Sequence, residues 1–452
     1  MTVIKARPGF GGRPAATTSL PWPSMESTSV RVGLLGCGVV GGSLVSLIES
    51  RCDDIETRTG MRLEIGPVAV RSLDKPRAVA VDPAQFTTDP AAVVDSPDVD
   101  VVVELMGGVE PAHELVAKAM ANGKPVITAN KALLAAEGAD LFAIADANRV
   151  DLLFEAAVAG GIPFIRPLRE SLAGEQISRV MGIVNGTTNY ILTRMTDDGA
   201  DYESALAEAQ ALGYAEADPT ADVEGFDAAA KAAIIASIAY GGRVVEADVY
   251  TEGIAHLSPT DIEVATKLGY VIKLLAVIES FGPDGVAVRV HPAMIPDTHP
   301  LASVRDSFNA VFVEGAADGD LMFYGRGAGD GPTASAVLGD LIDAASNLRK
   351  GTHASVTAST PAPIVPMDQL RSEFYLNLDV LDRPGALATV AGVLGSRGVS
   401  IRSMEQIGLG GEARILFITH TAREADVRAT LDDLRELEEV GQVNSVLRVL
   451  GA

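Results

Sequence analysis

The chain is long, acidic and poor in cysteine. Its 452 residues carry 36 Lys and Arg against 60 Asp and Glu, a net charge of −24, so its surface field repels nucleic-acid phosphates and anionic lipid headgroups. At about 150 residues per domain we expect about three domains, and no apolar run approaches the roughly 18 residues of a membrane span. Cys37 and Cys52 alone cannot build a secreted disulfide framework, which favours a reducing, cytoplasmic location.

The first 29 residues lack the apolar periodicity of a folded element. Glycine and proline are frequent there, and the stretch has no apolar core of the roughly 7 to 15 residues that a secretory signal peptide requires. We therefore predict that residues 1–29 form a disordered tail.

From residue 30 onward, short apolar strands alternate with helices. We expect strands at residues 30–35, 64–71, 99–104 and 125–128, and helices that begin at residue 43 and span 111–122 and 131–148. This alternation predicts a parallel, doubly wound α/β sheet of the Rossmann type over residues 30–154. A later helix, within about residues 325–350, is expected to return and complete this domain.

A glycine-rich loop follows the first predicted strand, at Gly36, Gly38, Val39, Val40 and Gly41. The first glycine permits a tight turn, the second lets the backbone approach a pyrophosphate, and the third lets the helix pack on the strand. Because the motif lies between a predicted strand and a predicted helix, it favours dinucleotide binding over a purely structural turn.

Basic residues follow the second predicted strand, where an NAD-binding domain usually carries an acid. Arg71, Lys75 and Arg77 stand there, and arginine favours a 2′-phosphate, so we predict NADP rather than NAD. A solvated basic turn is the alternative interpretation.

Thr128 and Lys131 lie at the carboxyl end of the fourth predicted strand. Open α/β sheets place ligand groups at this position, so a lysine there is expected to reach substrate or cofactor. A solvated lysine at the start of a helix explains the position nearly as well.

Residues 155–324 mix Ala-rich helices with strands and predict an α+β domain. Segments 155–163 and 183–189 consist of small residues whose carbonyls and amides suit an ion or a ligand, although tight packing explains them equally well. The glycine-rich segment 325–331 lacks the ending of a P-loop, so we expect a close-approach loop near the cofactor rather than an ATPase site.

The predicted helix at residues 226–240 is apolar at twelve of fifteen positions and should be buried. Asp227 and Lys231 are its only charged residues and lie one turn apart. Two charges in an apolar helix are costly unless they face a polar cleft, and burial with pairing also tunes a lysine for proton transfer. The pattern favours catalysis, with a structural ion pair as the alternative.

The C-terminal part has its own pattern. Residues 351–372 are rich in Pro, Ser and Thr and predict a linker, and residues 373–452 show the order βαββαβ of a separate ferredoxin-like unit.

Several motifs together resemble the homoserine dehydrogenase family, and they follow that family's order over about residues 30–350. They are the glycine loop, Thr128–Lys131, Glu155–Pro163, Gly182–Asn189, Gly213–Glu216 and Asp222–Lys231. The Asp382–Leu387 turn makes the C-terminal unit similar to an ACT domain, an amino-acid-sensing module.

The resemblance implies reversible, NAD(P)-dependent interconversion of L-homoserine and L-aspartate 4-semialdehyde. It makes Lys231 the proton donor to the carbonyl and places Lys131 close to substrate and nicotinamide. It implies that Glu216, Asp222 and Asp227 bind the substrate. It places cofactor contacts at the glycine loop, Arg71, Thr128, Gly213 and Gly331. It also implies a site for a monovalent cation such as Na⁺ at Glu155, Val158, Gly160 and Ile162.

The resemblance also implies substrate binding and dimerisation by residues 155–324, a homodimer or homotetramer, and threonine as an effector of the ACT unit. A thioester-forming enzyme is disfavoured because Cys37 lies in the phosphate loop and Cys52 on the first helix. The six histidines form no recognisable pair with a carboxylate, which disfavours a His-dependent hydroxy-acid dehydrogenase. An amino-acid-responsive binding protein without enzymatic activity is the other alternative.

Overall fold

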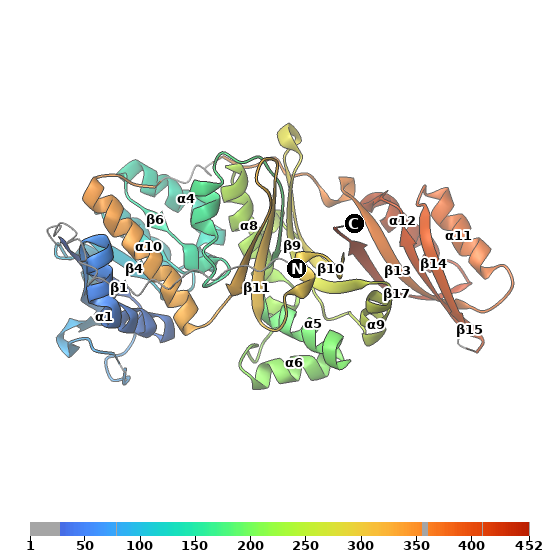
Figure 1. Cartoon of the computed structure of the whole chain (residues 1–452), viewed down its shortest axis with the longest axis horizontal. Coiled ribbons are helices and arrows are strands. Elements are labelled where there is room, and N and C mark those ends of the chain that lie inside the picture. Colours follow the sequence, from blue (N-terminus) through green and yellow to red (C-terminus); the bar gives the residue numbers. More distant parts are fainter. Residues whose placement is uncertain (1–27, 78, 355–359, 409, 452) are drawn as a thin grey trace, which may run out of the picture.

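The structure, a computed structural model, describes residues 28–77, 79–354, 360–408 and 410–451. Three folded parts follow one another along the long axis of the molecule (Figure 1). Most of the predicted tail lies outside the described residues, and Thr28 and Ser29 already belong to the first strand.

The first part is a six-stranded parallel sheet in the order β3-β2-β1-β4-β5-β6. Its strands are β1 (Thr28–Leu35), β2 (Met61–Ala69), β3 (Phe86–Thr87), β4 (Val101–Glu104), β5 (Val126–Thr128) and β6 (Leu152–Leu153). The chain runs outward from β1 in both directions, which confirms the predicted doubly wound sheet. Strands β3 and β6 have two residues each, too few to show a periodicity in the sequence.

Helices cover both faces of this sheet. One core contains α2 (Pro90–Asp95), α3 (Ala112–Ala121) and α4 (Lys131–Asn148). The opposite core contains α1 (Val39–Thr59) and α10 (Asp330–Lys350), which pack against each other (Figure 1). Because α10 follows the middle part in the chain, the expected return to the first domain is confirmed.

The second part begins with an antiparallel sheet in the order β12-β11-β7-β9-β10. Its strands are β7 (Ile177–Ile183), β9 (Tyr270–Ser280), β10 (Val286–Pro296), β11 (Phe308–Gly315) and β12 (Gly319–Arg326), and its helices are α5 (Gly186–Asp198), α6 (Tyr202–Ala211), α7 (Thr220–Val223), α8 (Phe226–Tyr240) and α9 (Pro259–Lys267). Helix α8 lies between this sheet and α4, so almost its whole surface is covered, as its lack of a polar face predicts.

The third part has the predicted order βαββαβ. Its elements are β13 (Arg371–Leu381), α11 (Ala386–Ser396), β14 (Ile401–Gly408), β15 (Glu412–Thr419), α12 (Glu424–Arg435) and β17 (Val440–Val449), with a short β16 (Ala422–Arg423) beside β13. The two helices cover one face of its sheet.

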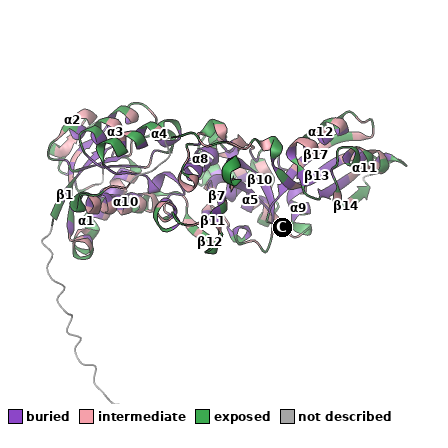
Figure 2. Ribbon diagram, turned by 90° about the horizontal axis from the view of Figure 1, so that it is seen from above, coloured by how far each residue is buried: buried purple, intermediate pink, exposed green. Residues whose placement is uncertain are grey.

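The third part has a hydrophobic core of its own, but its sheet is continuous with that of the middle part. Strand β17 pairs with β10 in parallel, at Ala293 with Arg448 and Met294 with Val449, so the two sheets form one sheet of eleven strands. Tyr375 of β13 belongs to the hydrophobic core of the middle part. Figure 2 shows buried residues on β10, β17 and β13 alike. The pairing of β17 with β10 satisfies backbone hydrogen-bonding groups that a free edge of β10 would expose. The periodicity of the sequence does not predict this pairing.

Part of the predicted linker is attached to the middle part. Arg243 bonds through its backbone to Thr360 and Ala362, and Val286 to Pro363 and Val365. Residues 355–359 lie outside the described residues. None of the helices in the described part of the chain combines the length and the apolar character that a membrane crossing needs.

Candidate active site

The glycine loop joins β1 to α1 and has the expected close contacts. Gly36 adopts a φ of 104°, and a Cβ there would lie 2.7 Å from the carbonyl oxygen of Leu105. A Cβ on Gly41 would lie 2.7 Å from the carbonyl oxygen of Gly36, whereas nothing lies within 4 Å of one on Gly38. Close packing therefore requires glycine at positions 36 and 41. At Gly38 the loop leaves open space beside the N-terminus of α1, and a helix N-terminus favours phosphate binding.

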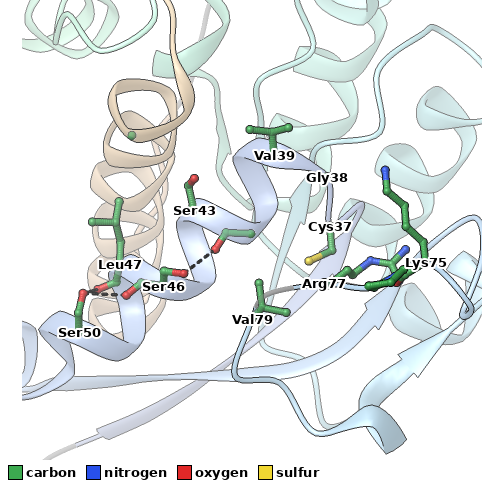
Figure 3. A pocket seen from close by; sticks show the side chains of 13 residues that line it. Cys37, Gly38, Val39, Ser43, Ser46, Leu47, Ser50, Lys75, Arg77 and Val79 are labelled. Carbon is green, nitrogen blue, oxygen red and sulfur yellow. Dashed lines mark hydrogen bonds between the residues drawn. The ribbon is translucent and has the colours of Figure 1, made fainter.

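Two cavities border this loop. One of about 630 Å³ lies between α1, with Val39 and Ser43 on its wall, and the side chains of Lys75 and Arg77 (Figure 3). Gly331, at the start of α10, lines the same cavity. The second, of about 510 Å³, is lined by Gly36, Gly38, Arg71, Lys75, Arg77 and the loop after β4. This glycine loop, helix N-terminus and basic rim fit a dinucleotide that carries phosphate groups.

The basic residues beside the cavities differ in their attachments. Arg77 donates to the carbonyl oxygens of Lys75 and Ser72, each at 2.9 Å, and its guanidinium lies over the ring of Phe86. Arg77 therefore holds the shape of the loop. Arg71 and Lys75 are exposed and line the cavity, so their charges face solvent or a ligand.

Thr128 is fully buried at the end of β5. Its hydroxyl donates to the Glu104 carboxylate at 2.6 Å and accepts from the backbone N–H of Asn130 at 3.0 Å. Asn130 in turn caps α4 by accepting from the backbone N–H of Leu133. These bonds fix the start of α4 and therefore the place from which Lys131 extends.

A lysine–aspartate cluster forms where α4 and α8 meet; its members are Lys131, Lys231, Asp227, Asn185 and Asp222. The Asp227 carboxylate bonds Lys131 through one oxygen and Lys231, at 2.6 Å, through the other. Asn185 donates from one amide nitrogen to Asp227 at 2.9 Å and to Asp222 at 2.6 Å. The structure thus joins both predicted lysines to Asp227 and, through Asn185, to Asp222. The Lys131 side chain is 48% exposed, so it is paired with Asp227 and also reaches solvent.

Burial and the charges of the two neighbouring lysines shift the pKa of Asp227 in opposite directions. Burial by itself raises the pKa of this carboxyl group, whose side chain is 5% exposed. The two ammonium groups outweigh burial and hold the pKa of Asp227 below its ordinary value, so the carboxylate stays charged. Lys231 uses two of its three N–H donors on Asp227 and on the carbonyl oxygen of Val184, at 2.7 Å, which leaves one for a ligand.

Asn185 is the member of the cluster that the sequence did not single out. Its side-chain oxygen caps α5 by accepting from the backbone N–H of Thr188 at 2.9 Å, so its amide nitrogen must point away from the helix. An Asn before Gly186-Thr187-Thr188 does signal a helix cap, but nothing local indicates that its amide reaches acids 37 and 42 residues away.

A cavity of about 360 Å³ opens in front of the two lysines. Its walls are Gly107 and Gly108 after β4, residues 129–132 after β5, Ala156, Ala157, Gly160, Gly327, Ala328, Thr333 and Lys231. The glycine-rich segment 325–331 therefore approaches this site closely, as expected: a Cβ on Gly160 would lie 2.2 Å from the carbonyl oxygen of Gly327. The cavity lies at the carboxyl ends of two parallel strands, where this fold binds ligands.

Two predicted residues lie apart from the cluster. Glu216 is exposed on the loop between α6 and α7, and within the described residues no hydrogen bond joins its side chain to the lysines or to Asp227. Gly213 ends α6 in a left-handed turn with a φ of 78°, and Figure 1 shows α6 far from α1. Their roles in substrate and cofactor binding stay predictions.

The segment with Glu155, Val158, Gly160 and Ile162 lies at the first domain's boundary. The Glu155 carboxylate accepts from the backbone N–H groups of Phe164 at 2.5 Å, Ile165 at 2.6 Å and Arg166 at 2.8 Å. Both of its oxygens are thus occupied by the following turn. Among the described residues, no group of three or more His, Cys, Asp or Glu side chains is arranged to hold a metal ion.

Comparison with known families assigns the three parts of the chain. Residues 36–155 match the homoserine dehydrogenase NAD binding domain, residues 163–342 match homoserine dehydrogenase, and residues 374–439 match the ACT domain. The homoserine dehydrogenase of Corynebacterium glutamicum is 49% identical over 427 residues, which are 93% of this chain and 96% of the relative. This chain belongs to the homoserine dehydrogenase family.

Solved structures of the homoserine dehydrogenase family agree with the fold. The structure of a homoserine dehydrogenase from Thiobacillus denitrificans matches with a TM-score of 0.87 and 42% identity, over 94% of this chain and 99% of that one. A hyperthermophilic archaeal homoserine dehydrogenase in complex with NADPH matches with a TM-score of 0.59 and 26% identity, over 70% of this chain and 98% of that one. The chain is an NAD(P)-dependent oxidoreductase that interconverts L-homoserine and L-aspartate 4-semialdehyde.

Proposed function

We propose that the lysine–aspartate cluster is where this homoserine dehydrogenase binds homoserine and moves its proton. The observation that carries the proposal is that Lys131 and Lys231 share the buried carboxylate of Asp227 beside the 360 Å³ cavity. Asp222 and Asp227 supply the negative charge that an amino-acid ammonium group requires. The kinetics of Lys231→Met and Asp227→Asn variants test this assignment.

The protein's part in the reaction is positioning and transfer of one proton. A bound nicotinamide supplies the hydride chemistry. In homoserine oxidation the Lys231 amine takes the hydroxyl proton, and in the reverse direction its ammonium group returns that proton to the carbonyl oxygen. Asp227 holds the Lys231 nitrogen in place, and Lys131, on α4, closes the cluster from the nucleotide-binding side.

We further propose that NADP is the preferred cofactor. Arg71 and Lys75 line the 510 Å³ cavity, with their charges toward solvent or ligand. The NADPH complex of the archaeal relative supports a phosphorylated dinucleotide in this family.

Replacing Arg71 by alanine should raise the KM for NADP by about 10- to 150-fold, because a charge-assisted hydrogen bond contributes about 1.5–3 kcal/mol. The KM for NAD should change less than about twofold, since NAD lacks the 2′-phosphate. Initial rates with each cofactor at saturating homoserine measure both values, and Arg58→Ala on the distant end of α1 is a control. Equal changes for NADP and NAD would favour a solvated basic turn.

A monovalent cation such as Na⁺ is proposed at residues 155–162. Because the Glu155 carboxylate is already occupied, this cation would use backbone carbonyl oxygens of Glu155, Val158, Gly160 and Ile162. Thermal unfolding in NaCl and in choline chloride at equal ionic strength tests the proposal, and identical midpoints would contradict it.

Threonine feedback through the ACT domain is the regulatory proposal, supported by the match at residues 374–439. The expected contact is the turn between β13 and α11, where Gly385 has a φ of 98° and Asp382 and Arg383 are exposed. Threonine should inhibit the wild-type chain, and Asp382→Ala should weaken that inhibition without changing the uninhibited rate. A homodimer or homotetramer and a cytoplasmic location stay predictions; sedimentation of the purified chain would measure the first.

A further inference from the structure

A buried ion-pair junction joins the ACT domain to the middle part of the molecule, which is called the substrate domain below. Arg448, on the last strand β17, has a side chain that is only 7% exposed. It donates to Glu424 of the ACT domain at 2.6 and 3.0 Å, and to Glu252 of the substrate domain at 2.8 Å. Its guanidinium also lies over the ring of Tyr250, whose hydroxyl bonds the other oxygen of Glu252. One carboxylate from each domain thus fixes the same guanidinium.

Arg448 and Glu424 are buried in this junction, whereas the Glu252 side chain is 29% exposed. Arg289 and His291, on the neighbouring strand β10, are 2% and 0% exposed. Burial lowers the pKa of His291 well below its ordinary value, so this ring is neutral and supplies no screening charge. In such surroundings an ion pair interacts strongly, and removing one partner leaves a costly unpaired charge.

The segment that carries Glu252 packs tightly against the loop before α8. A Cβ on Gly253 would lie 2.4 Å from the carbonyl oxygen of Val223, and one on Gly225 would lie 3.0 Å from the side chain of Thr251. The backbone N–H of Ile254 also donates to Val223 at 2.8 Å. The two backbones therefore have no space to shift independently.

The loop before α8 leads directly into the lysine–aspartate cluster. Gly225 has a φ of 86° and caps α8, two residues before Asp227. Asp222 begins the same turn, and Asn185 bonds both carboxylates. A displacement of Glu252 would therefore displace residues 222–227 and separate these acids from their partners.

We propose that Arg448 is a positioning residue for the dehydrogenase reaction: through Glu252 it holds residues 222–227 in the geometry that binds homoserine. The ACT domain's last strand thereby completes the frame of the substrate site even when no effector is bound. This inference rests on the proposed substrate role of Asp222 and Asp227.

The two carboxylates of the junction provide a matched pair of variants. Glu252→Gln and Glu424→Gln each remove one negative charge beside the same guanidinium. Of the two positions, Glu252 is the one whose neighbouring backbone packs against the loop before α8. Without threonine, we expect Glu252→Gln to raise the KM for homoserine at least about fivefold, with kcat and the KM for NADP changed less than about twofold. Glu424→Gln should lower the unfolding midpoint and leave the KM for homoserine within about twofold of wild type.

Arg448→Met and Arg448→Lys extend the test. Methionine should raise the KM for homoserine as Glu252→Gln does, and lysine, which can still reach Glu252, should restore part of the loss. If Arg448→Met does not fold, the pair of glutamine variants still decides. A KM for homoserine that is unchanged in Glu252→Gln, or raised equally in Glu424→Gln, would overturn the proposal.

The same assays separate this inference from the proposed substrate site. If the KM for homoserine is unchanged in both Asp222→Asn and Asp227→Asn, the substrate site itself is misassigned. If those variants raise it and Glu252→Gln does not, the site stands and the positioning role of Arg448 fails.

Discussion

Replacing Lys231 by methionine is expected to lower kcat for homoserine oxidation by about 10²- to 10⁴-fold, the usual contribution of a positioned acid or base. Methionine fills the same apolar space among the alanines of α8 but cannot accept the hydroxyl proton. The change also leaves the carbonyl oxygen of Val184 without its donor at 2.7 Å, a modest cost in stability of about 1–3 kcal/mol. The absorbance of reduced nicotinamide measures the rate, and circular dichroism checks the fold.

Lys231→Arg separates charge from proton transfer. The guanidinium keeps the pairing with Asp227 but does not lose its proton near neutral pH, so this variant should be as inactive as methionine. Lys124→Met is a matched control, because this buried lysine also donates to a backbone carbonyl, that of Val94 at 2.7 Å, and lies outside the site. It should retain wild-type kcat. Near-normal turnover in Lys231→Arg would remove Lys231 from the proton-transfer step.

Replacing Asp227 by asparagine should lower kcat/KM for homoserine from about 30-fold to several thousandfold, because losing one partner of a buried charge pair costs about 2–5 kcal/mol. Both lysines lose the anion that holds them together, and the ammonium group of the substrate loses a counter-charge. The Kd for NADP, measured by fluorescence of the reduced form, should change little, since Asp227 lines neither of the two cavities beside the glycine loop.

The pH dependence of the loss of kcat/KM in Asp227→Asn follows from the low pKa of Asp227. A carboxyl group whose pKa is held below its ordinary value is ionised throughout the range from about pH 5 to 9, so the defect of Asp227→Asn should have the same size at both ends. Asp218→Asn, an exposed acid on the same stretch of chain, is the control and should leave kcat/KM unchanged. A defect that vanishes toward pH 5 would mean that Asp227 is already protonated there.

Much of the local structure could be predicted because its signals are local. The β-strand, glycine loop and helix at residues 30–49 follow from apolar periodicity and from glycines whose backbone contacts allow no side chain at Gly36 and Gly41. The pairing of Asp227 with Lys231 also lies within one helical turn. Its burial follows from the apolar sequence of α8, so local pattern alone identified this pair, two of the five members of the cluster.

The assembly of the whole cluster depended on contacts between distant segments. Lys131 and Asp227 are 96 residues apart, and they meet because α4 and α8 pack against each other. The sequences of α4 and α8 do not indicate which face of each helix packs against the other helix. The sequence placed Asn185 only within the small-residue segment 183–189, and it did not show that Glu216 is exposed away from the cluster. Both positions depend on where α5, α6 and α7 lie relative to α8.

By itself the sequence determined the order of helices and strands, the dinucleotide loop, the buried charged helix and the βαββαβ plan of the C-terminal part. These properties arise from residues close together in the chain, whose spacing sets periodicity, turns and caps. Only the tertiary structure decided that β17 completes the sheet at β10 and that Arg448 reaches Glu252 across that junction. The physical reason is that strand pairing uses the backbone, which is the same at every residue, so the side chains alone do not specify which distant strand a free edge will pair with.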